Sequence, residues 1–330
     1  MKSRPFDVNA MFWCFKHNRL CRRYTAALVG GLLLEIAGSP CVGFSMMGAM
    51  WGFLDPSCLA FLAWIYIMRS VRPHIIIHEC TEAFPHQVLD MLLNEGFDLR
   101  YIIESIVTCM TDVCVPIKRK RRYTVGRLQS LVVSRAFTKE SFERVAASEL
   151  KVDGVFFLRA DKAAIEEHKA YMAQEFGLMP SSCNGQPWSW RAVLSANQMS
   201  RIRKVFDASL VSSDGVFLSL AQDISHQSSI LSRCIPTLIR NSLIYFLHPD
   251  RHQDRMAVPI EYYGMQMFPV MLPPCHWAAQ MKFDHFLKEA NMLDFNRARR
   301  LCGNGMCVPA IGSILAFVLT TSQLKGGNGI

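Results

Sequence analysis

Apolar runs separated by short polar breaks dominate the first third of the chain. Residues 32–37 form an apolar run typical of a buried strand, and the run breaks at Gly38-Ser39-Pro40. Residues 72–80 contain a second apolar strand, which ends in an acid. The apolar stretch between them, residues 57–71, is typical of a crossover helix. This order predicts a right-handed parallel strand–helix–strand unit and therefore an α/β fold.

A single thiol, that of Cys41, follows the turn that ends the first predicted strand. A cysteine on a tight turn at a strand end is arranged as a nucleophile would be. The carboxyl ends of parallel strands share one edge of a sheet, where ligands bind, so Cys41 and Glu79 are predicted neighbours. Each residue also has an ordinary alternative explanation, because free cysteines usually pack in cores and strand-end acids are usually solvated.

Five consecutive cations, residues 118–122, enter another strand predicted within residues 115–126. Such a run is costly unless something anionic meets it. In a strand, Arg119 and Arg121 point to one face and the other three cations to the opposite face. A solvated charge run and a nuclear-import patch remain as alternatives.

These segments, in this order, resemble the signature blocks of the C5-cytosine methyltransferase family. Gly38-Ser39-Pro40-Cys41 is similar to the Pro-Cys nucleophile block of the family. Glu79-Cys80-Thr81 falls on the Glu-Asn-Val block, and residues 116–121 fall on the Pro-Gln-x-Arg-x-Arg block. Further on, residues 259–269 are similar to the Pro-Arg-Glu…Gln-Gly-Phe-Pro block, and residues 303–309 to the Gly-Asn…Val-Pro block. The chain keeps the acid and both arginines but lacks the asparagine and glutamine amides.

The resemblance implies a Rossmann-like, S-adenosylmethionine-dependent methyltransferase sheet with a second, smaller target-recognition domain. It divides the chain into a catalytic α/β domain at residues 1–126, a target-recognition region at 127–254, and a C-terminal segment at 255–330 that returns to the catalytic domain. The implied function is DNA (cytosine-5-)-methyltransferase activity, in the nucleus or, for a prokaryotic source, in the cytoplasm.

The catalytic roles of the family fall on Cys41, Glu79, Arg119 and Arg121. The thiolate of Cys41 would add to C6 of a flipped-out cytosine, and Glu79 would hydrogen-bond the base near N3. Arg121, with Arg119 as support, would stabilise the anionic adduct and the thiolate, because a nearby cation lowers the pKa of a thiol.

The cofactor site is the part of the family pattern that the chain matches least. The family begins with a Gly-rich Phe-x-Gly-x-Gly turn, whereas residues 1–37 contain only Gly30-Gly31 and no ribose-binding acid. Pro40 and Asn304 fall where the family contacts S-adenosylmethionine. We therefore expect a truncated or degenerate member, and the alternative functions are a catalytically inactive nucleic-acid-binding relative and a tRNA cytosine-C5 methyltransferase.

The region after the arginine block mixes helical patterns with loops. Residues 137–142 begin a helical pattern, residues 163–176 predict an amphipathic helix, and residues 177–190 read as an irregular loop. Cations at 201–204 could dock on a duplex through phosphate contacts. An ordinary α+β subdomain is the alternative. Residues 310–319 predict a C-terminal apolar helix.

Composition favours a basic protein with a large core. The 330 residues are 51% hydrophobic, enough for one large or two unequal domains, and the formal net charge of +9 suits a polyphosphate such as double-stranded DNA, or alternatively tRNA. The 12 cysteines show no paired C-x-x-C spacing, so neither disulfides nor a metal site is predicted. Apolar stretches at 26–36 and 58–68 are shorter than the roughly twenty residues that span a bilayer, so no membrane partner is predicted.

Overall fold

The computed structural model describes residues 11–14, 19–22, 31–40, 42–45, 50–146, 152–175, 177, 189–223, 230–231, 234–250, 253–268, 270 and 294–324. The chain divides into two compact units. Unit 1 comprises Met1–Thr108, Lys120–Ala146 and Ile314–Ile330, and unit 2 comprises Cys109–Arg119 and Ala147–Ser313.

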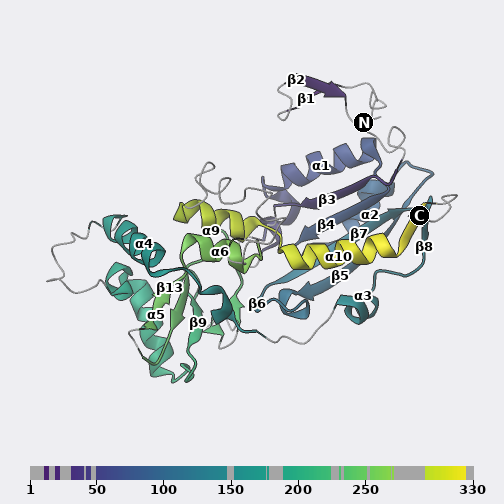
Figure 1. Ribbon diagram of the computed structural model, residues 1–330. Coiled ribbons are helices and arrows are strands. Elements are labelled where there is room, and N and C mark those ends of the chain that lie inside the picture. Colours follow the sequence, from purple (N-terminus) through teal and green to yellow (C-terminus); the bar gives the residue numbers. More distant parts are fainter. Residues whose placement is uncertain are drawn as a thin grey trace. The chain divides into compact units, whose positions relative to one another are not determined.

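Unit 1 is built on a four-stranded sheet of order β3-β4-β7-β5 (Figure 1). Strands β3 (Leu34–Gly38) and β4 (Ile75–Cys80) are parallel, and helix α1 (Cys58–Val71) connects them. The predicted strand–helix–strand unit and the α/β class are therefore confirmed. Strand β7 (Lys120–Leu128) runs antiparallel to β4, and β5 (Tyr101–Cys109) lies beyond β7.

Helices α1 and α2 (Gln87–Asn94) bury their apolar sides in one cluster with the sheet. Phe61, Ile65 and Met68 recur at helical spacing along α1 and pack in this cluster with Ile76 and Cys80 of β4. This burial is what holds the two predicted strands and their crossover helix together, at about 25 cal/mol for each Å² of apolar surface removed from water.

A second part of the unit 1 core surrounds the C-terminal segment. Strand β14 (Ser322–Leu324) pairs antiparallel with β8 (Leu131–Val133). The rings of Phe137, Phe142 and Phe317 meet with centroids 5.6 to 6.2 Å apart, which joins α3 (Lys139–Ala146) to the end of α10 (Val308–Thr320). The helices expected from residues 137–142 and 310–319 are thus present.

Unit 2 contains a four-stranded antiparallel sheet of order β10-β9-β12-β13 and a short parallel pair of β6 and β11. Its strands are β6 (Ile117–Lys118), β9 (Val216–Ser219), β10 (Ile230–Leu231), β11 (Ile235–Pro236), β12 (Ile244–Leu247) and β13 (Arg255–Met256). Its helices are α4 (Lys162–Glu175), α5 (Ala196–Asp207), α6 (Pro259–Met265), α9 (Phe295–Asn304) and the first part of α10, and α4 corresponds to the helix predicted at residues 163–176.

Unit 1 also contains a hairpin of β1 (Met11–Cys14) and β2 (Arg19–Arg22).

The strand predicted across residues 115–126 is wrong in one respect, because it breaks at Arg119. Strand β6 ends at Lys118 and pairs with β11 of unit 2, whereas β7 begins at Lys120 and pairs with β4 of unit 1. The backbone N–H of Arg119 donates to the carbonyl of Ile117 at 2.9 Å, which closes a tight turn between the two strands. Arg119 and Arg121 therefore do not share one face of a continuous strand.

The compact units divide the chain at other positions than the predicted domains do. Residues 127–146 cluster with unit 1 and residues 255–313 with unit 2, while the functional division at 126 and 254 stays a prediction.

Among the described residues, one segment, Phe295–Thr320, is long and apolar enough to cross a membrane by length and composition. A break at Gly305 separates it into α9 and α10, and both helices contribute buried side chains, among them Cys302 and Phe317.

Candidate active site

The register of the two parallel strands brings the predicted nucleophile turn to the predicted acid. Gly38, at the end of β3, pairs with Glu79 in β4. The Ser39-Pro40 segment that leads to Cys41 therefore begins beside Glu79. Cys41 itself lies outside the described residues, so its position stays a prediction.

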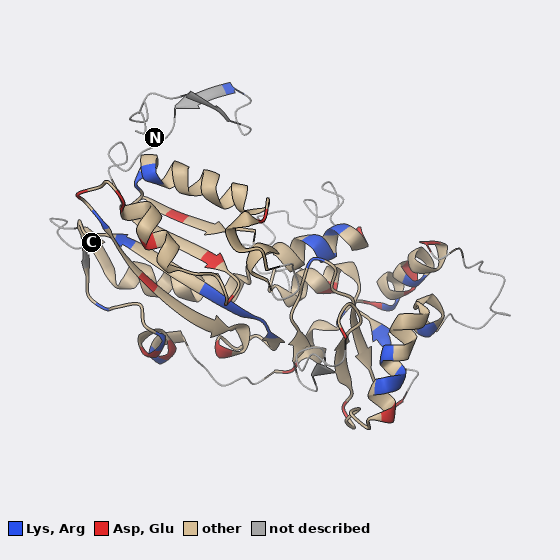
Figure 2. Ribbon diagram, turned by 180° about the vertical axis from the view of Figure 1, so that it is seen from behind, with Lys and Arg blue, Asp and Glu red and all other residues tan. Residues whose placement is uncertain are grey.

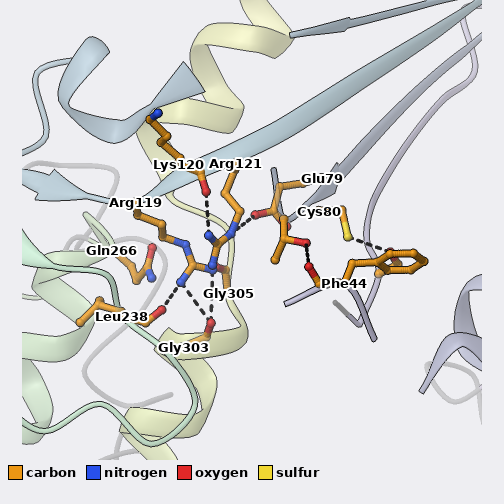
Figure 3. A network of polar contacts seen from close by, with 12 residues as sticks. Phe44, Glu79, Cys80, Arg119, Lys120, Arg121, Leu238, Gln266, Gly303 and Gly305 are labelled. Carbon is orange, nitrogen blue, oxygen red and sulfur yellow. Dashed lines mark hydrogen bonds and ion pairs between the residues drawn. The ribbon is translucent and has the colours of Figure 1, made fainter. Parts of the chain in front are cut away.

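Glu79 and Arg121 form a buried ion pair at this edge of the sheet. The Nε atom of Arg121 lies 3.1 Å from Oε1 of Glu79, with 11% and 7% of the two side chains exposed (Figure 3). Arg121 also donates from Nη1 to the carbonyl of Lys120 at 2.7 Å. A carboxylate and a guanidinium taken out of water together compensate each other, and both keep hydrogen-bonding capacity for a polar ring placed beside them.

The next cation of the run, Arg122, has partners of its own in unit 1. Its guanidinium donates to the carbonyl of Glu82 at 3.0 Å and to the hydroxyl of Ser105 at 3.3 Å, and it lies 3.2 Å from a ring nitrogen of His86. Burial, and then the charge of Arg122, lower the pKa of His86. Lys120 is exposed. Three cations of the run thus differ in their surroundings: Arg121 is in the buried ion pair, Arg122 is in the local network, and Lys120 faces solvent.

Arg119, the other predicted arginine, holds backbone within unit 2. It is 2% exposed, and its guanidinium donates to the carbonyl of Leu238, to that of Gly303 at 3.1 and 3.2 Å, and to that of Gly305 at 3.0 Å (Figure 3). A guanidinium presents its donors in a rigid fork, which suits carbonyls that converge from the end of a helix and from a loop. Arg119 therefore fixes the end of α9.

Two further residues fix the same end of α9. Gln266 donates from Nε2 to the carbonyl of Cys302 at 2.6 Å. Gly303 packs so closely on another loop that a Cβ there would overlap the backbone of Ile239 and Arg240. Asn304 is the last residue of α9 and its side chain is exposed.

S-adenosylmethionine fits the described residues only in part. Pro40 and Asn304 are exposed and available for contact. A ribose needs an acceptor for its hydroxyl groups. The carboxylate of β3, that of Glu35, instead accepts from the indole N–H of Trp64 at 3.3 Å. Pro40 belongs to unit 1 and Asn304 to unit 2, and the one carboxylate of β3 is already engaged in a hydrogen bond.

Two of the buried thiols in the described residues are those of Cys58 and Cys302. Burial raises the pKa of Cys302 to about 12 and also raises that of Cys58, so these thiols stay protonated at neutral pH. Within the same residues, no group of three His, Cys, Asp or Glu side chains is placed to hold a metal ion.

Comparison with known proteins matches residues 34–214 to the C-5 cytosine-specific DNA methylase family. The chain belongs to this family, as its sequence blocks predicted. The type II methyltransferase M.MthTI of Methanothermobacter thermautotrophicus is 27% identical over 139 residues, which are 41% of this chain and 41% of that protein. M.DsaV of Dactylococcopsis salina is 31% identical over 97 residues, 28% of each chain. The matched part is thus less than half the length of either relative.

Among solved structures, the S. pombe Dnmt2 methyltransferase is similar to this chain at 15% identity and a TM-score of 0.45. The alignment covers 87% of this chain and 78% of that chain.

Proposed function

We propose that the protein is a DNA (cytosine-5-)-methyltransferase that works through a covalent adduct between Cys41 and a flipped-out cytosine. The observation that supports this most strongly is the Glu79–Arg121 ion pair, which lies where β3 passes into the turn before Cys41. Membership of the family supplies the chemistry, and the pair retains two of the polar groups that this chemistry needs.

The chemistry begins with access to the base. Cytosine lies inside the base stack, so it is extruded at a cost of a few kcal/mol and held in a pocket. The thiolate of Cys41 adds to C6, a C–S bond forms, and the electron pair of the 5,6 double bond moves towards C5 and N3. Glu79 hydrogen-bonds the ring near N3, and the guanidinium of Arg121 stabilises the negative charge of the adduct. S-adenosylmethionine would supply the electrophilic methyl group that C5 takes, and loss of the C5 proton then expels the thiolate.

Double-stranded DNA is the proposed partner, with tRNA as the alternative. The net charge of +9 favours either polyphosphate. Helix α5 presents Arg203 and Lys204 to solvent on one element of unit 2, and Figure 2 shows cations along this helix. Arg201 instead donates to the carbonyl of Leu220, which anchors the helix. Exposed cations of this kind contact phosphates and position a duplex without reading its sequence.

Covalent trapping tests the proposal. A duplex with 5-fluorocytosine is incubated with the protein and S-adenosylmethionine, because fluorine at C5 cannot leave as a proton does and the adduct persists. We expect a covalent complex from the native chain and none from Cys41→Ser. A complex that persists in Cys41→Ser would exclude Cys41 as the nucleophile.

Two binding measurements separate the alternatives. Calorimetry with S-adenosylmethionine should show binding; without it, the inactive nucleic-acid-binding alternative holds and the enzyme proposal fails. Competition between duplex DNA and tRNA at fixed salt should favour the duplex, and preference for tRNA would move the substrate to the alternative.

A further inference from the structure

A hydrogen bond joins the middle of β4 to the turn that precedes Cys41. The hydroxyl oxygen of Ser39 lies 2.8 Å from Nε2 of His78 and 3.8 Å from the sulfur of Cys80. His78 and Cys80 are two residues apart on a strand, so their side chains leave the same face of the sheet. The hydroxyl can accept from the ring nitrogen and donate to the sulfur, so this turn is tied to β4 by side chains as well as by strand pairing.

The surroundings of His78 are those of a core residue. Its ring stacks on Trp64 at 5.2 Å and 22°, and the rings of Phe61 and Phe84 lie 5.5 and 4.9 Å away. The strand neighbours on the same face, Ile76 and Cys80, belong to the apolar cluster under α1 and α2. An apolar side chain would fill this place as well as histidine does, so packing alone does not explain a polar ring that is 1% exposed.

Burial lowers the pKa of His78 to about 3, so the ring is neutral near pH 7. A neutral imidazole has one donor and one acceptor nitrogen in a fixed plane, and Ser39 meets one of them. The His78 ring is therefore unsuited to proton transfer at neutral pH. It is well suited to a directional hydrogen bond with the turn.

We propose that His78 is a positioning residue for the nucleophile: its hydrogen bond to Ser39 fixes the turn two residues before Cys41. This inference rests on the proposed function, because the placement of the turn matters for catalysis only if Cys41 attacks the base. A misplacement of about 1 Å at a reacting group costs on the order of a hundredfold in rate.

The experiment compares His78→Leu, Ser39→Ala and the double variant by the rate of covalent trapping with 5-fluorocytosine duplex. Each single variant should trap about 10- to 100-fold more slowly. The double variant should be no slower than the slower single one, because both remove the same bond. His78→Gln, whose amide can reach the Ser39 hydroxyl, should restore most of the rate, and affinities for S-adenosylmethionine and duplex should change less than about twofold.

A matched control lies at the other end of the same strand pair. His74 accepts a hydrogen bond from the backbone N–H of Leu33 at 3.0 Å, at the start of β3. His74→Leu should leave the trapping rate unchanged in the folded protein. Thermal unfolding confirms that each variant is folded, and Ser39→Ala keeps the test available if His78→Leu does not fold.

Failure of this inference is distinguishable from failure of the proposed function. If the native chain traps no duplex, the proposed function fails. Hydrogen exchange at the amides of Gly38 and Ser39 then still tests the bond. The exchange rate should rise about tenfold or more in His78→Leu and return towards the native rate in His78→Gln. Native trapping and exchange rates in a folded His78→Leu would overturn the positioning role.

Discussion

The ion pair at the sheet edge allows a prediction about stability that does not depend on activity. Arg121→Met removes the cation and leaves the carboxylate of Glu79 buried at 6% exposure. At the observed 3.1 Å, the Coulomb attraction at an effective dielectric of 20 is 332/(20 × 3.1), or about 5 kcal/mol. Desolvation of the two charges offsets part of this attraction, so we expect the substitution to cost about 3 kcal/mol of unfolding free energy.

A double-mutant cycle separates the pair from the packing of its members. Glu79→Gln keeps the shape of the side chain and leaves Arg121 without its counter-charge. The double variant has no unpaired charge, so it should be more stable than Arg121→Met alone. We expect an interaction free energy of about 2–3 kcal/mol between the two positions.

The measurement must report on unit 1, because the chain folds as two compact units and one global transition is not assumed. Hydrogen exchange at the amides of β4 gives the opening free energy in that unit. The exposed pair Lys139–Glu143, at 3.5 Å within α3, is the control and should show about 0.5 kcal/mol or less. An interaction below about 1 kcal/mol between Glu79 and Arg121 would refute the buried ion pair as a stabilising contact.

Three further predictions concern the rest of the structure. Arg119→Met should quicken hydrogen exchange at the end of α9 and cost about 3 kcal/mol, since three carbonyls lose their donor; an equal effect of Lys118→Met, which is exposed, would contradict this. Gly303→Ala should cost about 3 kcal/mol in thermal unfolding by overlap with the facing loop, and a neutral result would show that the loop moves away freely. Because the folded pKa of His78 lies near 3, below its ordinary 6.5, stability present above pH 6.5 should be lost as pH falls towards 3, by up to about 1.4 kcal/mol per unit; His78→Gln should flatten this dependence in urea unfolding.

The local pattern was sufficient to predict the part of the fold that carries the site. Apolar periodicity located α1 within a residue and the two parallel strands around it, because these elements are defined by burial along the chain. The rule that parallel strands share a carboxyl edge then placed Glu79 beside the turn after β3. The family resemblance assigned Arg121 to the same catalytic group, and the structure adds that it forms an ion pair with Glu79.

The division of the arginine block was not predictable from strand alternation. A single residue separates Arg119 from Arg121, yet Arg119 contacts carbonyls at positions 238, 303 and 305 and Arg121 contacts an acid at position 79. Alternation along a strand describes neighbours in sequence only. Partners more than a hundred residues away decide where β6 ends, and a pairing with β11 outweighs the continuity of the strand.

The hydrogen-bond partner of His78 was not predictable from the sequence either. A polar residue within an apolar strand gives no indication of its partner, and the family pattern assigns none to this position. In this chain Cys80 stands where the family pattern has the amide that follows the acid, and on the same face of β4 His78 forms a hydrogen bond with Ser39. Since Glu79 points to the opposite face of the strand, the acid and the turn can be held independently. Loss of the amide therefore need not loosen the turn before Cys41, because another residue of β4 supplies a hydrogen bond to it.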